Sequence, residues 1–233
     1  MKISNRLQEL STFINPEDKM IDIGCDHALL DIYLCEEYKD IKIIASDIHE
    51  EALKNASNNV TKNKLNDRIE LRLGDGLTVV NKDEIDTILI SGMGFNTIKK
   101  ILSNKEKMEG IKKIVVQSNT DVVKLRKFVI KLGYKIVKEK LVKDNDIIYT
   151  IIEFNKGEEK YTYDEIYFGP RILENKDELF YEYYSKKLLK YENLLLQIPK
   201  YELKSKLHHK YLIKIIRRAL TTKEKSIDEK EEK

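Results

Sequence analysis

The chain has 233 residues, which is the length of one large domain or two small ones, and a net charge of only +3. Its 41% hydrophobic and 36% charged residues are typical of a globular protein with a strongly charged surface. No stretch reaches the roughly 18 apolar residues of a membrane span, and the N-terminus lacks the apolar core of a signal peptide. We therefore expect a cytoplasmic protein that makes no membrane contact. The two cysteines, Cys25 and Cys35, form no CxxC pair, so we expect neither a disulfide framework nor a bound metal.

The charges are unevenly distributed near the C-terminus. Residues 186–220 contain ten Lys and Arg residues and two acids, whereas residues 221–233 contain four Lys and five acids. A basic run of this kind can form a nucleic-acid-binding surface, or it can be the solvated face of a helix. Charge alone leaves both interpretations open.

Residues 19–154 alternate between short apolar runs and helical patterns. The runs that read as strands are 19–23, 41–46, 68–73, 85–90 and 113–117. The helical patterns between and after them include 28–37, 49–63 and 122–132. This alternation predicts an α/β fold, a doubly wound parallel sheet with helices on both faces.

Two further apolar runs, 134–142 and 147–154, are separated by only four residues. Such a short connection cannot hold a helical crossover, so we predict an antiparallel hairpin at the end of the sheet. A doubly wound sheet with this ending resembles the Rossmann-like fold of class I S-adenosylmethionine methyltransferases. A dinucleotide dehydrogenase would more often continue with parallel strands.

The pattern changes after residue 154. Residues 155–160 read as a linker, and Gly169-Pro170 marks a chain reversal. Residues 174–198 carry a heptad-like apolar seam that ends before Pro199, and helical spacing resumes from Leu203. We expect these two helices to form an antiparallel, coiled-coil-like hairpin. The predicted organisation is a methyltransferase domain at 1–157, a helical domain at 158–220 and a disordered tail at 221–233.

The first candidate site is the loop after the first strand, residues 22–28 with the sequence DIGCDHA. This position binds the nucleotide ligand in a doubly wound sheet, and Gly24 lets the backbone approach that ligand closely. The helix that follows presents its N-terminus, which favours a carboxylate such as that of a methionine moiety. A single glycine argues against a pyrophosphate cradle. A plain tight turn is the alternative interpretation.

Acidic residues follow the second and third strands. Asp47, about 20 residues after Gly24, is placed to accept hydrogen bonds from ribose hydroxyls. It could instead cap the next helix. Asp75, between Gly74 and Gly76, could accept from an adenine amino group or form an ordinary turn.

The sequence SGMG follows the fourth strand at residues 91–94. Many amino-directed methyltransferases carry an Asn/Asp-Pro-Pro-Tyr element here, which this chain lacks. Gly92 and Gly94 would leave an open wall against which a base could lie. Met93 could line the pocket or fill the core.

Together these motifs resemble the bacterial tRNA (adenine-22-N1)-methyltransferases, the TrmK family. GCDHALL at 24–30 is similar to that family's G-[ST]-D-H-A-Y-L, and SGMG is similar to its A-G-M-G-G. Further matches, in order, are GDGL at 74–77, QSN at 117–119, LR at 125–126 before Gly133, and Gly169-Pro170. The chain departs from the family pattern at Cys25, Asp31, Phe95 and Ser118, where Ser or Thr, Pro, Gly and Pro are usual.

The resemblance implies methyl transfer from S-adenosylmethionine to N1 of an unpaired adenine, at position 22 of tRNA. For cofactor binding we expect Asp22, Gly24, Cys25, Asp26, His27, Asp47, Ile48, Asp75, Gly76, Gly92 and Met93. For substrate binding we expect Phe95, Asn119, Lys186, Lys187, Lys190, Lys204, Lys210, Arg217 and Arg218. Asp26 is the first candidate for a catalytic group, because a carboxylate could stabilise the developing ring charge or accept a proton. His27 is the second.

Three other interpretations stay open. A methyltransferase for a small molecule or a protein would not need the basic helices. A non-catalytic RNA-binding protein with a relic cofactor fold would bind S-adenosylmethionine weakly or not at all. A nicotinamide enzyme is disfavoured by the single glycine and the terminal hairpin. We expect a monomer. Dimerisation through the helical hairpin is the alternative.

Overall fold

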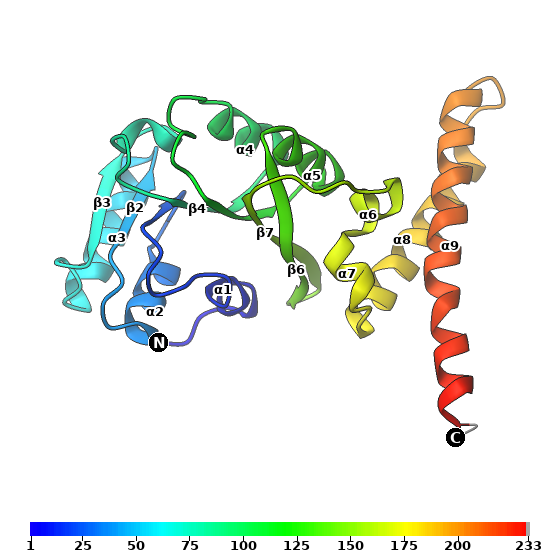
Figure 1. The fold of residues 1–233 in the computed structure, drawn as a ribbon, viewed down its shortest axis with the longest axis horizontal. Helices are drawn as coiled ribbons and strands as arrows, with labels where there is room; N and C mark the ends of the chain where they lie inside the picture. The colour runs from blue at the N-terminus through cyan, green and yellow to red at the C-terminus, as the bar shows by residue number, and fades with distance from the viewer. Residues whose placement is uncertain (232–233) are drawn as a thin grey trace. The chain divides into compact units, whose positions relative to one another are not determined.

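The computed structural model describes the backbone of residues 1–231 and the side chains of residues 1–221 (Figure 1). The chain forms two compact units, of which the first ends at Leu173 and the second begins at Glu174. Among the described residues, none of the helices is long and apolar enough to cross a membrane.

The first unit is built on one seven-stranded sheet with the strand order β3-β2-β1-β4-β5-β7-β6. The strands are β1 (Met20–Ile23), β2 (Ile43–Asp47), β3 (Ile69–Leu73), β4 (Thr87–Met93), β5 (Lys113–Ser118), β6 (Tyr134–Asp144) and β7 (Ile147–Lys156). Neighbouring strands from β3 to β5 are parallel, whereas β7 runs antiparallel to both β5 and β6. The predicted strands and terminal hairpin are therefore confirmed.

Helices cover both faces of this sheet (Figure 1). Side chains along β4 alternate between two core clusters, with Ile88 and Ile90 in one and Leu89 in the other. The Leu89 cluster includes residues of α1 (Asn5–Ser11), α2 (Leu29–Glu37) and α3 (Glu50–Lys62). The Ile88 cluster includes residues of α4 (Phe95–Leu102) and α5 (Val122–Lys131). The strands read as continuous apolar runs because a parallel sheet is buried on both sides.

Several short helices were not among those that the sequence predicts. These are α1, α4, the 3₁₀ turn η1 (Gly76–Val79), α6 (Tyr163–Phe168) and α7 (Pro170–Glu174). The sequence of α4 does contain helical apolar spacing, since Ile98, Ile101 and Leu102 share one buried face. α1 begins at the capping residue Ser4, whose hydroxyl accepts a hydrogen bond from Leu7 N at 3.4 Å.

The boundary between the two units lies sixteen residues after the predicted one at 157, because α6 is tied to the sheet. Arg126 on α5 makes this connection. Its side chain is 2% exposed and forms an ion pair with the buried Glu139 of β6 at 2.7 Å. The same guanidinium donates to the carbonyl oxygens of Ile166 and Tyr167, both at 3.2 Å. The C-terminal turn of α6 is therefore part of the first unit.

The second unit is a hairpin of two long helices, α8 (Glu178–Gln197) and α9 (Leu203–Glu231). Tyr191 on α8 meets His209 on α9 edge to face at 5.7 Å, and Arg217 pairs with Glu192 at 2.6 Å. The predicted helical hairpin is confirmed. The predicted disordered tail at 221–233 overlaps the end of α9; its side chains after 221 and the whole of residues 232–233 lie outside the described residues, so its disorder stays a prediction.

Candidate functional site

Two adjoining pockets open at the carboxyl ends of the parallel strands, where doubly wound folds bind their ligands. The larger has a volume of about 720 Å³ and the smaller about 100 Å³. They share Arg6, Gly24, Asp26 and Ser91 as lining residues. Every residue predicted to bind the cofactor lines one or both of them.

The loop after β1 forms the wall between the two pockets. Gly24 adopts φ +83°, and its N–H and that of Cys25 both donate to Ser46 O, at 2.8 and 3.0 Å. Asp26 and Ala28 also adopt positive φ, 51° and 55°, which is uncommon for residues with a side chain. The loop therefore holds two residues in a conformation that costs free energy, and such residues cluster at functional sites.

The side chains at the tip of this loop are presented to solvent. Asp26 and His27 are 72% and 47% exposed in their side chains, and Asp26 Oδ1 lies 3.6 Å from His27 Nε2. They are therefore accessible to a large substrate. Cys25, in contrast, is buried, and burial raises the pKa of its thiol, so it stays protonated.

Asp47 organises two loops at once. Its Oδ1 accepts a hydrogen bond from His49 N at 2.9 Å, and its Oδ2 accepts one from Asp26 N at 3.4 Å. The first residue before α3 is His49, so Asp47 closes the turn that leads into the helix and does not cap it directly. It is 9% exposed and lines the larger pocket beside Ile48, where a ribose could reach it.

Two acids lie beneath the loop. Burial raises the pKa of Asp22 to about 7; the neighbouring Asp47 carboxylate adds to this rise, and Arg6 opposes it. Asp31, at 0% exposed, has its pKa raised well above the usual value by burial and by the charge of Asp22. Neither oxygen of Asp31 has a hydrogen-bond partner among the described residues.

The far end of the larger pocket carries Asp75 and Gly76. Lys100 on α4 reaches Asp75 at 2.5 Å, and both side chains are about half exposed or more. The Asp75 carboxylate can therefore exchange this exposed partner for another donor, such as an adenine amino group. Gly76 adopts φ +60° and packs against Ile101, where a side chain would meet atoms at 3.0 Å.

The side of the site near β5 is a hydrogen-bonded cluster. Gln117 Oε1 accepts from Gly92 N at 3.0 Å and from Arg6 at 2.9 Å. Its Nε2 donates to Asn119 Oδ1 at 2.9 Å, and Asn119 Nδ2 donates to Gly92 O at 2.6 Å. Arg6 also donates to Ser91 Oγ at 2.5 Å. The predicted residue Asn119 thus touches the turn that carries Gly92 and Met93.

Phe95 does not lie where it was expected. Its side chain is 9% exposed, belongs to the core and packs edge to face on Phe128 at 6.2 Å between ring centroids. It lines neither pocket. The expected contact between Phe95 and a base therefore has no support here, because α4 begins at this residue and turns the ring into the core.

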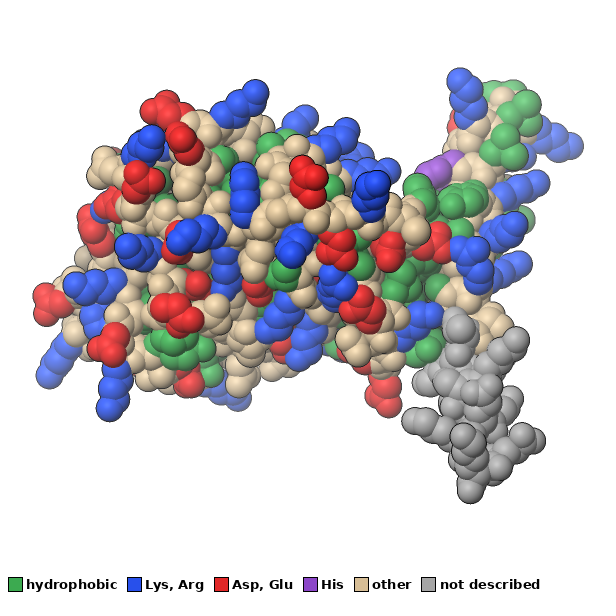
Figure 2. Space-filling view, in the orientation of Figure 1, with side chains coloured by type: hydrophobic (Ala, Val, Ile, Leu, Met, Phe, Trp, Pro, Cys, Tyr) green, Lys and Arg blue, Asp and Glu red, His purple; other side chains and the backbone are tan. Residues whose placement is uncertain are grey.

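The seven basic residues predicted to bind substrate all belong to the helical unit, where basic side chains follow α9 (Figure 2). They are exposed except Lys187, which is half-buried beside the rings of Tyr183 and Tyr184. Lys186 pairs with Glu182 at 2.7 Å, and Arg217 pairs with Glu192. Among the described residues, no cluster of His, Cys, Asp and Glu could hold a metal ion.

Sequence reasoning missed Arg6, Gln117 and Lys100 as pocket-side residues. Gln117 stands in a motif that the sequence singled out, at the end of a buried strand. Arg6 belongs to the unpredicted helix α1, and nothing in its local sequence connects it with residues 91 and 117. Only the fold brings these groups together.

The sheet is parallel except for its last strand, which is reversed, and an acid-flanked loop with a glycine lies where the strand order changes direction. These two features define the class I S-adenosylmethionine-dependent methyltransferases. The chain is similar to the structure of M. capricolum TrmK in complex with S-adenosyl-homocysteine, at 33% sequence identity and a TM-score of 0.85. The match covers 95% of this chain and 99% of that one. The B. subtilis m1A22 tRNA methyltransferase TrmK structure matches 94% of this chain and 99% of its own, at 25% identity and a TM-score of 0.85.

Sequence comparison agrees. The model of the tRNA (adenine(22)-N(1))-methyltransferase family, TrmK, matches residues 20–220. The tRNA (adenine(22)-N(1))-methyltransferase of Bacillus subtilis is 31% identical over 205 residues, which is 85% of this chain and 86% of that protein. The chain belongs to the TrmK family of tRNA (adenine(22)-N(1))-methyltransferases.

Proposed function

We propose that this chain transfers the methyl group of S-adenosylmethionine to N1 of adenine 22 in tRNA, with the larger pocket holding the cofactor and the smaller one opening to the base. The observation that carries this proposal is the convergence of all the predicted cofactor residues on two pockets that share Gly24 and Asp26. The family to which the chain belongs supports the same reaction.

In the larger pocket, each end of the cofactor has a chemical partner. Asp47 would accept hydrogen bonds from the ribose hydroxyls, and Asp75 would accept one from the adenine amino group in place of Lys100. Asp22 lines the smaller pocket, so it would meet the cofactor's ammonium group where the two pockets adjoin at Gly24, and its ionised form would favour that cation.

The reaction is an in-line displacement at the methyl carbon. The lone pair of adenine N1 forms the new C–N bond while the C–S bond breaks, and its electron pair stays on sulfur to give the neutral thioether of S-adenosyl-homocysteine. The ring then carries the positive charge that the sulfonium has lost. Most of the acceleration would come from aligning N1 with the methyl group.

Asp26 is placed to act on that charge. It lines both pockets, and its exposed carboxylate stabilises the cationic ring or accepts the proton of the amino group. His27, 3.6 Å away, would hold that carboxylate in place when it carries a proton of its own. Adenine N1 is available only in an unpaired base, so the tRNA must expose it.

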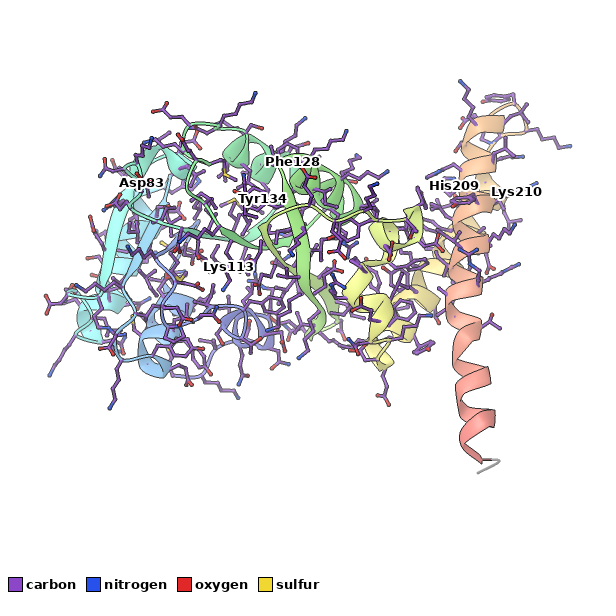
Figure 3. All side chains as sticks on the ribbon, viewed as in Figure 1. Asp83, Lys113, Phe128, Tyr134, His209 and Lys210 are labelled. Carbon is purple, nitrogen blue, oxygen red and sulfur yellow. The ribbon has the colours of Figure 1, made fainter. Side chains whose placement is uncertain are left out.

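The helical unit would hold the tRNA through its phosphates. Lys190, Lys204 and Lys210 are exposed on α8 and α9 (Lys210 is labelled in Figure 3). Lys186 and Arg217 would exchange their exposed carboxylate partners for phosphate oxygens, which costs little because such surface pairs are weak. We place the enzyme in the cytoplasm with its substrate, and as a monomer.

The test is methyl transfer from labelled S-adenosylmethionine to unmodified tRNA, followed by mass spectrometry of the nucleosides. We expect 1-methyladenosine, and no product when adenine 22 of the tRNA is replaced by guanine. Equal methylation of the altered tRNA would exclude position 22. No transfer despite cofactor binding would favour a small-molecule or protein substrate.

The role of Asp26 has its own test. Asp26→Asn keeps the shape and should lower kcat while the cofactor still binds. Asp83→Asn is the matched control, because Asp83 also has positive φ, 61°, but lies on the connection between η1 and β4 (Figure 3). Unchanged turnover in Asp26→Asn would remove Asp26 from the chemistry.

A further inference from the structure

Arg6 reaches the site from a part of the chain that lies before the residues matched by the family model. It is the second residue of α1, in the first turn of the helix, and lines both pockets. Its guanidinium is half-buried and lies 5.5 Å above the ring of Tyr149 on β7. A cation held in this way at the border of two pockets needs an explanation beyond packing.

α1 is anchored independently of Arg6. Leu10 is fully buried, Glu9 pairs with Lys140 of β6 at 2.7 Å, and Lys138 Nζ donates to Thr12 O at 2.6 Å. Removing the Arg6 guanidinium should therefore leave the helix in place. The contacts of Arg6 can then be judged by what they do to the site.

Those contacts end on one turn of the backbone. Arg6 donates to Ser91 Oγ and to Gln117 Oε1, and Gln117 Oε1 also accepts from Gly92 N. Gln117 holds Asn119, which donates to Gly92 O. Both polar groups of Gly92 are thus held by side chains that are linked to Arg6, Gln117 directly and Asn119 through Gln117.

This turn needs such support. Gly92 adopts φ +80°, and the pairing of β4 with β5 shifts register between Ser91 and Met93. The regular ladder that would otherwise fix the backbone is interrupted here. Met93 follows at once, and its methyl group lies where a side chain on Gly24 would be, so the turn also shapes the cofactor side.

We propose that Arg6 is a positioning residue for methyl transfer, which fixes the Ser91–Gly92–Met93 turn through Gln117 and Asn119 and so sets the wall against which the acceptor adenine lies. The inference rests on the proposed function and deepens it. A donor-only guanidinium suits this task, because it donates to two oxygen acceptors at once. Loosening the wall misplaces the base relative to the methyl group, and small displacements of this kind cost rate steeply.

The experiment compares wild type with Arg6→Met, Arg6→Lys, Asn119→Ala and the double variant Arg6→Met/Asn119→Ala. All are assayed at pH 9, above the pKa of Asp22 of about 7, so that the rise in this pKa on removing Arg6 changes the ionisation of Asp22 as little as possible. Arg6→Met should lower kcat on tRNA by about 10- to 100-fold, as expected for misplacement of about 1 Å. The Kd of S-adenosylmethionine by calorimetry should change much less than kcat, with the Tm unaltered, because Gly92 and Met93 are the only predicted cofactor residues on this turn and the other nine stay in place.

Two comparisons separate positioning from other roles. The double variant should be little slower than either single variant, because both changes break the same chain of hydrogen bonds. Arg6→Lys should recover part of the rate, since an ammonium group can reach one of the two oxygens. The control Lys140→Met breaks the ion pair that anchors α1 and should leave kcat unchanged.

Each opposite result overturns the inference. A kcat within twofold of wild type in Arg6→Met would show that the turn does not need Arg6. Additive losses in the double variant would show that Arg6 acts on the substrate directly. An equal loss in Lys140→Met would assign the effect to the anchoring of α1. If wild type itself methylated no tRNA, the proposed function would fail, and this result is separate from full activity in Arg6→Met.

Discussion

Asp31 offers a direct test of how this structure handles a buried charge. It lies in the first turn of α2, is 0% exposed, and neither of its oxygens has a hydrogen-bond partner among the described residues. A buried polar group without a partner costs about 1–3 kcal/mol of stability. We therefore expect Asp31→Ala to stabilise the protein.

The size of the effect follows from three contributions. Alanine removes the desolvation cost and improves helix propensity by about 0.5 kcal/mol. It also removes the favourable interaction of a carboxylate with the helix N-terminus, which is worth about 0.3–1 kcal/mol. The net gain should be about 0.5–3 kcal/mol, which for a chain of this length raises the Tm by roughly 1–12 °C.

The gain should depend on pH. Burial raises the pKa of Asp31 in the folded protein above its value in the unfolded chain. The folded state therefore binds this proton more tightly. The contribution of Asp31 to stability is fully present below its ordinary pKa of about 4 and is lost as the pH rises through the raised pKa of the folded protein. Asp31→Ala should gain more at pH 8 than at pH 5.

Thermal unfolding followed by circular dichroism at pH 5, 6.5 and 8 measures this difference. Asp31→Asn is the matched control, because it keeps the shape and the buried polar atoms but cannot ionise. It should show a smaller gain in Tm and the same loss of pH dependence. A lower Tm for Asp31→Ala at every pH would refute the reasoning, since it would show that the carboxylate has a stabilising partner such as a buried water.

Three further outcomes are expected. Asp47→Asn should weaken S-adenosylmethionine binding by about 10- to 100-fold in calorimetry, because a hydrogen bond to a charged acceptor is worth about 1.5–3 kcal/mol. An unchanged Kd would show that Asp47 only holds the two loops through His49 N and Asp26 N. Arg126→Met should lower the free energy of unfolding by about 3–5 kcal/mol in urea titrations, because its buried carboxylate partner loses its charge pair; a loss below about 1 kcal/mol would contradict this. Replacing Lys190, Lys204 and Lys210 together with Gln should flatten the salt dependence of tRNA binding by about two to three in log–log slope, provided that each contacts a phosphate.

Much of the site could be predicted because parallel strands bring their carboxyl ends to one edge. The residues after β1, β2, β3 and β4 must meet there, so Gly24, Asp47, Asp75 and Gly92 share a site although they are far apart in the chain. The same logic predicts Phe95 beside the base, but its side chain packs in the core and lines neither pocket, so this contact stays a prediction. A residue next to the edge can also begin a helix and point into the core, and local sequence does not distinguish the two.

The sequence alone was enough to predict the strands in chain order, the longer helices α2, α3, α5, α8 and α9, the reversed last strand and the acidic loops at the carboxyl ends of the strands. These features follow from patterns within short segments, where apolar spacing and turn residues act locally. Only the tertiary structure decided the partners of Arg6 and Arg126. Arg6 donates to Ser91 and Gln117, which are 85 and 111 positions further along the chain. Arg126 on α5 bonds to β6 and to the end of α6. A long, flexible side chain has many possible partners along the chain, and packing of distant elements selects the one that it meets.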